Sequence, residues 1–284
     1  MTAQIRRAFR RTFPRTWLTL ASFVVWLATA TMYATAAPTG DIPPRQTWSF
    51  SGLNGAYDKA QLRRGLQIYE QKCRACHSMK HLDFRALTRP GGPELTLKEA
   101  QEIAASYEFP TVSDDGEPAK RPSRLSDHFI SPYANPEQAK YLNLGVAPPD
   151  LTYMTLARSY DRSFTQFVRD LFIPYAEQGS DYVYAILTGY DDQDPALTTN
   201  RYAPGGKLNM AKPLFDDEFE YPKNTAGEPE APQTEAQYAK DVTTFLTWAA
   251  DPDRAARQRT GWYVLGYLTV FLGLLLVTMH YRRK

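Results

Sequence analysis

Cysteine is scarce in this sequence, since only Cys73 and Cys76 occur among its 284 residues. Both belong to one short motif, which leaves no cysteine for a structural disulfide elsewhere. A zinc site is disfavoured, because such a site needs four ligands and the chain has no third cysteine. A redox dithiol of the thioredoxin kind would open a helix after a strand, whereas a helical pattern precedes this motif.

The two cysteines stand in the sequence C-R-A-C-H, from Cys73 to His77. C-x-x-C-H is typical of covalent attachment of a c-type haem. The two sulfurs form thioethers with the haem vinyl groups, and the adjacent histidine becomes the proximal ligand of the iron. The motif therefore predicts one covalent haem c, attached at Cys73 and Cys76 and ligated by His77.

A second pattern that the sequence lacks is the apolar–polar alternation typical of strands, for which we find no convincing run. Helical spacing is present instead. Asp58 is a plausible N-cap for a helix that places Leu62, Leu66, Tyr69 and Cys73 on one face. We therefore expect a mainly α domain with long irregular loops. The other expected helices are Thr96 to Glu108, Leu151 to Tyr160 capped by Asp150, Ser163 to Phe172, Asp181 to Leu187, and Glu235 to Ala250.

Long apolar runs are also few, and the mean hydropathy is −0.47. The first run, from Trp17 to Tyr33, follows five arginines and precedes Ala34-Thr35-Ala36. This order is typical of a secretory signal peptide, so we expect residues 1–36 to be cleaved after Ala36. A retained membrane anchor is the alternative. Export also fits the motif, since bacterial c-type cytochromes acquire haem outside the cytoplasmic membrane.

The second apolar run extends from Gly261 to Met279, and its 19 residues would measure about 28 Å as a helix. That length spans the hydrocarbon core of a bilayer. We expect a transmembrane helix at 260–280, a cytoplasmic tail at 281–284 and an exported haem domain at 37–259. The basic residues Arg254, Arg257 and Arg259 weaken the positive-inside signal of the tail, so the signal peptide decides this orientation.

One axial position of the iron remains to be filled, and three methionines lie in the expected exported domain. Met79 is too close to His77 to reach the opposite face of the ring, and Met154 falls inside an expected helix. Met210 lies in a loop whose prolines and glycines, Pro204, Gly205, Gly206 and Pro213, let backbone approach a flat cofactor. We favour Met210, with His128 or an open site as alternatives.

Several motifs, in their order along the chain, resemble the cytochrome c1 family. After C-x-x-C-H come A-P-P-D-L-T from Ala147, Y-V-Y-A-I-L-T-G-Y from Tyr182, N-M-A-K-P-L around Met210, and A-K-D-V-T-T-F-L-T-W-A-A-D-P from Ala239. A C-terminal anchor follows. The resemblance covers nearly all of the expected exported domain, and it implies a cytochrome c-like fold.

The resemblance implies roles for five residues. Cys73 and Cys76 would carry the thioethers, His77 would be the proximal ligand and Met210 the distal ligand. Arg158 would contact a haem propionate, although an ordinary surface ion pair is its alternative. The helix that bears Gly65 and Tyr69 would cross the helix that bears Phe245 and Trp248.

The resemblance also implies a redox subunit of the cytochrome bc1 complex that is no enzyme on its own. It would pass electrons from the Rieske iron–sulfur protein to a cytochrome c, beside cytochrome b in the bacterial cytoplasmic membrane. Without residues 1–36 and 261–284, the chain carries 25 basic and 31 acidic residues. We expect this acidic part to attract a basic cytochrome c and no nucleic acid. The rival hypotheses are a stand-alone membrane-anchored carrier that feeds a terminal oxidase, and a haem enzyme or gas sensor.

Overall fold

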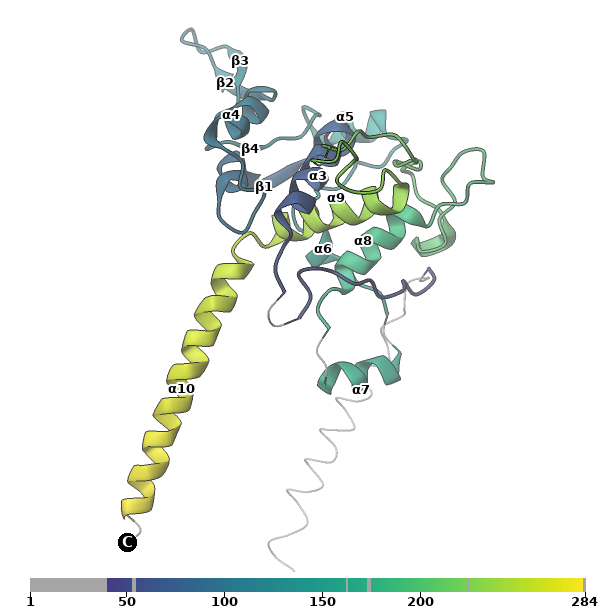
Figure 1. Ribbon diagram of the computed structural model, residues 1–284. Helices are drawn as coiled ribbons and strands as arrows, with labels where there is room; N and C mark the ends of the chain where they lie inside the picture. Colours follow the sequence, from purple (N-terminus) through teal and green to yellow (C-terminus); the bar gives the residue numbers. More distant parts are fainter. Residues whose placement is uncertain (1–39, 53–54, 162, 173–174, 224, 283–284) are drawn as a thin grey trace, which may run out of the picture. The chain divides into compact units, whose positions relative to one another are not determined.

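The computed structural model describes residues 40–52, 55–161, 163–172, 175–223 and 225–282 (Figure 1). The expected signal peptide, residues 1–36, lies outside this part of the chain. The described part is mainly helical with long loops, as the sequence predicted.

Two helices cross at the centre of the domain that contains the C-R-A-C-H motif. α3 (Lys59–Gln71) begins after Asp58, whose carboxylate accepts a 2.6 Å hydrogen bond from the backbone N–H of Gln61. α9 (Glu235–Ala250) has the predicted bounds. A Cβ added at Gly65 on α3 would lie 2.7 Å from Cβ of Phe245 and even closer to the Asp241 carbonyl oxygen. Only glycine lets the two backbones approach this closely.

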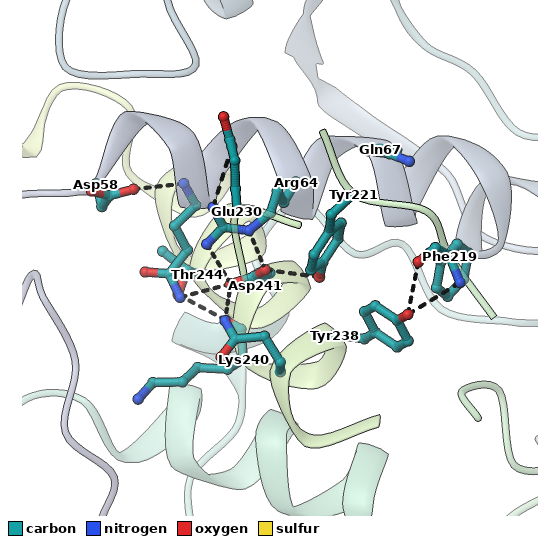
Figure 2. Close-up of polar contacts among 12 residues, drawn as sticks. Asp58, Arg64, Gln67, Phe219, Tyr221, Glu230, Tyr238, Lys240, Asp241 and Thr244 are labelled. Carbon is teal, nitrogen blue, oxygen red and sulfur yellow. Dashed lines mark hydrogen bonds and ion pairs between the residues drawn. The ribbon is translucent and has the colours of Figure 1, made fainter. Parts of the chain in front are cut away.

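A buried polar network joins the two helices at the crossing (Figure 2). The Arg64 guanidinium lies 2.7 Å from a carboxylate oxygen of Asp241. The same carboxylate accepts hydrogen bonds from Tyr221 at 2.8 Å, Gln61 at 3.0 Å and Gln237 at 2.7 Å. Because the donors come from α3, from α9 itself and from Tyr221, the network fixes how α3, α9 and the segment around Tyr221 meet.

The apolar core lies between α3, α9 and the segment that follows the C-R-A-C-H motif. Tyr69 on α3 contacts Phe245 on α9 at a ring-centroid distance of 6.0 Å, and Phe84 contacts Phe129 at 4.2 Å. α8 (Gln178–Thr188) packs on α9, where the Ser180 and Thr247 hydroxyls are 2.9 Å apart. The expected crossing of the helices bearing Tyr69 and Phe245 is thus confirmed.

The sequence shows no convincing strand pattern, yet the mainly helical chain also forms two short strand pairs. β1 (Met79–Asp83) pairs antiparallel with β4 (His128–Phe129), and β2 (Glu108–Val112) pairs antiparallel with β3 (Pro118–Pro122). Prolines hid the second pair, because proline is depleted in strands. In a sheet of two strands every strand is an edge, so a proline can face solvent without breaking a ladder bond.

Several helix bounds differ from the predicted ones. α4 (Leu97–Ala105) ends earlier because Glu108 already belongs to β2, and Thr96 with Glu99 forms a capping box at its start. α6 (Met154–Ala157) replaces the helix expected over Leu151 to Tyr160. α5 (Pro136–Leu142) was not expected, whereas α7 (Phe164–Phe172) begins one residue after its predicted start. The remaining short helices are η2 (Cys73–Ala75), η3 (Phe84–Thr88) and η4 (Pro204–Gly206).

α10 (Arg254–Arg282) is the C-terminal helix, and its 29 residues are long and apolar enough to cross a membrane. It begins earlier than the predicted span at 260–280. Its first residue is tied to the rest of the chain, since the Arg254 guanidinium donates to the Phe50 carbonyl at 2.9 Å and lies 3.4 Å from the Glu177 carboxylate. Three residues separate α9 from α10.

Candidate haem site

The C-R-A-C-H motif forms a tight turn directly after α3. Lys72 caps the helix by donating its N–H to the Ile68 carbonyl, and η2 follows. The backbone N–H groups of Cys76 and His77 both donate to the Cys73 carbonyl, at 3.1 and 2.9 Å. The turn holds two free thiols and one imidazole within five residues, the set that a c-type haem requires. Burial, with Cys76 nearby, raises the pKa of Cys73 to about 12, so its thiol is protonated at neutral pH.

The His77 ring is oriented by a backbone carbonyl. Its Nδ1 lies 2.8 Å from the carbonyl oxygen of Pro149. A carbonyl can only accept, so Nδ1 carries the proton and Nε2 keeps a free lone pair for a metal. Burial lowers the pKa of the imidazole, which favours the neutral form that binds iron. The imidazole therefore has the protonation state and tautomer of a proximal ligand.

The carboxylate of Asp150 holds the Pro149 carbonyl in place. One oxygen accepts hydrogen bonds from the Ser78 hydroxyl at 2.7 Å and the Lys80 N–H at 2.8 Å, and the other accepts from the Thr152 N–H at 2.9 Å. Burial opposes ionisation of Asp150, but these hydrogen bonds outweigh it and keep its pKa below the ordinary value. The expectation that Asp150 caps a helix is wrong, because its side chain binds this loop and the strand β1 instead.

Met210 lies in the glycine-containing loop after η4. Gly205 and Gly206 have φ of 77° and 75°, which glycine adopts without strain. The Tyr190 hydroxyl donates to the Met210 carbonyl at 2.9 Å, and Tyr190 is buried. Met210 is half-buried, and this hydrogen bond restrains its backbone. The contacts described for Met210 link it to Tyr190 and not to His77, so the distal-ligand assignment stays a prediction.

The other residues considered as distal ligands are two methionines in or against the core and one exposed histidine. Met79 is fully buried in the core, and Met154 packs partly buried against it. His128 is exposed on β4, opposite Asp83 of β1.

Arg158 follows α6 and is exposed. Within the described part of the chain it forms no ion pair, so the ordinary surface pair that was its alternative is not observed there. Its charge acts on Tyr182 of α8, where burial raises the phenol pKa and Arg158 partly lowers it. Arg158 is therefore a cation available to an anionic group on this side of α8.

A cavity of about 810 Å³ opens beside Cys76. Its lining includes Cys76, Tyr133, Pro148 and Asp150. Among the described residues that line it, His77, Arg158 and Met210 are absent, so the cavity marks one side of the motif and not the whole site. Asn143 donates to the Tyr133 hydroxyl at 2.9 Å, which fixes this ring beside the thiol.

Sequence reasoning missed Pro149, Tyr133 and Tyr190. Pro149 acts through a carbonyl, which every residue has, so the only available signal was its place beside Asp150. Tyr133 lies in no motif, and Tyr190 ends the Y-V-Y-A-I-L-T-G-Y motif without any sign there of its contact with Met210. The two thiols and the oriented imidazole nevertheless form a donor set that fits a c-type haem.

Comparison with known proteins places the chain among cytochromes. The model of the cytochrome C1 family matches residues 48–284. The chain is 40% identical over 265 residues to cytochrome c1 of Blastochloris viridis, covering 90% of this chain and 92% of that protein.

Two further relatives come from different sources. Cytochrome b/c1 of Bradyrhizobium diazoefficiens is 41% identical over 246 residues, which are 84% of this chain but only 35% of that longer protein. The mitochondrial cytochrome c1 heme protein of Saccharomyces cerevisiae is 38% identical over 235 residues, 80% of this chain and 67% of the relative. Since the family model covers most of the sequence, the chain belongs to the cytochrome c1 family.

Proposed function

We propose that this chain is the haem subunit of a bacterial cytochrome bc1 complex and passes electrons from a Rieske iron–sulfur protein to a cytochrome c. The cofactor is a c-type haem, as its family and a relative named as a heme protein confirm. The observation that carries the proposal is the His77 imidazole, whose Nδ1 is bound to the Pro149 carbonyl and whose Nε2 is left for iron. Haem supplies one-electron redox chemistry when it is bound.

The residues of the chain have separate roles in this proposal. Cys73 and Cys76 would hold the cofactor covalently, and His77 and Met210 would ligate its iron. With two protein ligands the iron would be closed to an exogenous ligand and suited to electron transfer. Arg158 offers a positive charge to a propionate. These side chains make or break no substrate bond, so the subunit is a redox relay and no enzyme on its own.

The same proposal implies how the chain is attached to the membrane and which proteins it contacts. α10 would span the cytoplasmic membrane once, at about 260–280, and residues 37–259 would lie in the periplasm after cleavage of the leader. The Bradyrhizobium relative joins cytochrome b and c1 in its name, which supports cytochrome b as a neighbour of this chain. The Rieske protein as donor and a cytochrome c as acceptor are our inference from the family.

The first test is the optical spectrum of the haem-loaded Met210→Leu chain beside the parent and a Met154→Leu control. The parent and the control should be low-spin and inert to carbon monoxide, whereas Met210→Leu should bind carbon monoxide and have a lower reduction potential. If Met210→Leu behaves like the parent, the distal ligand lies elsewhere.

A separate test addresses the complex. Affinity purification of the full chain from its native membranes should recover a b-type cytochrome and an iron–sulfur protein. Recovery of the haem protein alone would support the stand-alone carrier instead.

A further inference from the structure

Helix α7 carries an apolar stripe that nothing in the described chain covers. Its large apolar side chains are Phe164, Phe167, Val168, Leu171 and Phe172, and they follow the spacing of one helical face. All five are exposed, with Phe164 at 79% and Phe172 at 82% of their surface. The only buried residue of the helix is charged. α7 is therefore oriented opposite to an ordinary core-facing helix.

The polar side of α7 attaches it to the domain. The buried carboxylate of Asp170 lies 2.6 Å from the guanidinium of Arg45. That guanidinium also stacks over the Tyr175 ring at 4.2 Å, and the Tyr175 hydroxyl donates to Asp181 of α8 at 2.8 Å. These contacts fix the rotation of the helix so that its apolar stripe points away from the protein.

Two connections tie α7 to the first residue of α10. On one side, Glu177 follows Phe172 by five residues, at most about 17 Å of chain, and its carboxylate contacts Arg254. On the other side, Arg45 precedes Phe50 by five residues, and the Phe50 carbonyl accepts from the same Arg254 side chain. α7 is thus held close to the point where α10 leaves the domain.

The distance along α10 from Arg254 to the membrane interface can be compared with the reach of the connection between α7 and Glu177. Trp262 and Tyr263 lie at the start of the apolar run of α10, and tryptophan and tyrosine are enriched at membrane interfaces. Trp262 follows Arg254 by eight residues, about 12 Å along a helix. The chain from Phe172 to Glu177 has a maximum reach of about 17 Å, which exceeds that distance. The stripe on α7 can therefore reach the level of the headgroups.

We propose that α7 lies in the plane of the membrane surface, with its apolar stripe in the boundary between lipid headgroups and acyl chains. A short amphipathic helix rich in phenylalanine and leucine inserts roughly 5–10 Å into that boundary. Lipid is favoured over a protein partner because the helix is tethered to the start of α10. The inference rests on the proposed membrane span of α10 and adds a second membrane contact to it.

The test uses the full haem-loaded chain in nanodiscs of phosphatidylcholine and phosphatidylglycerol. Both native cysteines are consumed by the haem, so one introduced cysteine can carry a nitroxide spin label. We compare Leu171→Cys on the stripe, Gln166→Cys on the polar side of the same helix, and Leu268→Cys in α10. The measurement is the ratio of accessibility to oxygen, which partitions into lipid, and to a water-soluble nickel chelate.

The expected result is a high oxygen-to-nickel ratio at Leu171→Cys and Leu268→Cys, and a low ratio at Gln166→Cys. A label at position 171 that the nickel chelate reaches as freely as position 166 would overturn the lipid contact while position 268 still reports the span. A label at 171 protected from both reagents would also overturn it, in favour of a protein partner. A water-like label at 268 would overturn the span and the lipid contact together.

Discussion

Arg64 on α3 and Asp241 on α9 form an ion pair that is closed to water, with 10% and 0% of their side-chain surfaces exposed. Their Nε–Oδ2 distance is 2.7 Å, and three further donors converge on the same carboxylate. The pair sits where the two central helices cross (Figure 2). The haem motif follows the C-terminus of α3, so this contact also supports the site.

Arg64→Met should strongly destabilise the domain, because it leaves a buried carboxylate without its cation. Loss of one partner of a buried pair costs about 3–5 kcal/mol. The control is Lys72→Met, which removes the more exposed pair with Glu218 and should cost at most about 1 kcal/mol. Urea unfolding of the detergent-solubilised chain, followed by far-ultraviolet circular dichroism, measures both. Equal losses of unfolding free energy in the two variants would contradict a larger contribution from the buried pair.

Gly65→Ala tests the close approach of α3 and α9. The new Cβ would meet Cβ of Phe245 at 2.7 Å and the Asp241 backbone, so the helices must separate. Overpacking of this kind costs typically about 1–3 kcal/mol. Gly266→Ala in α10 adds the same group where nothing lies within 4 Å, and it should leave the unfolding of the haem domain unchanged. A Gly65→Ala chain as stable as the parent would contradict the crossing.

Tyr190→Phe should loosen the loop that carries Met210. The substitution removes the 2.9 Å hydrogen bond to the Met210 carbonyl, worth about 1 kcal/mol, and keeps the ring in place. We expect slow partial carbon monoxide binding in the ferrous protein, where the parent shows none. Tyr263→Phe, on exposed α10, is the matched control. Complete inertness of both variants would mean that this bond does not restrain the ligand loop.

The ionisation of Asp127 makes the free energy of unfolding depend on pH, and the direction of this dependence follows from the pKa of Asp127. The Arg121 guanidinium, at 2.6 and 3.0 Å, and the Arg124 N–H hold the pKa of this carboxyl below its ordinary value of 3.8. A carboxyl whose pKa is lower in the folded than in the unfolded chain stabilises the fold fully at pH values above its unfolded pKa. This stabilisation is lost as the pH falls through its folded pKa.

Asp127→Asn should therefore be less stable than the parent near neutral pH, and the difference should shrink below about pH 4. Unfolding midpoints measured across this range provide the check. Asp115→Asn, at an exposed position, serves as the comparison. A difference that grows on acidification would contradict the assigned ion pair.

The central helices could be predicted because local signals and tertiary contacts agree there. Asp58 and Thr234 cap α3 and α9. The apolar spacing of α3 matches the face that it buries, whereas α9 is buried on all sides from Asp241 to Ala250. The segment after Asp150 misled the prediction. An aspartate after two prolines has the same sequence signal whether it caps a helix or binds a distant loop, and its partners Ser78 and Lys80 are about seventy residues away.

The haem motif was predictable because its chemistry requires fixed spacing. Its orientation was not, since the Pro149 carbonyl gains its role only when the chain folds back to His77. The β2–β3 hairpin was missed for a related reason. Prolines 110, 118 and 122 lower the propensity of each strand alone, and only pairing makes them acceptable.

The three-residue link between α9 and α10, together with the two contacts of Arg254, leaves little slack between the haem domain and its anchor. A long flexible tether would let such a domain swing between a donor and an acceptor. If the proposed function holds, this chain would stay in place while its redox partners move, and turnover would depend on how fast each of them arrives and departs.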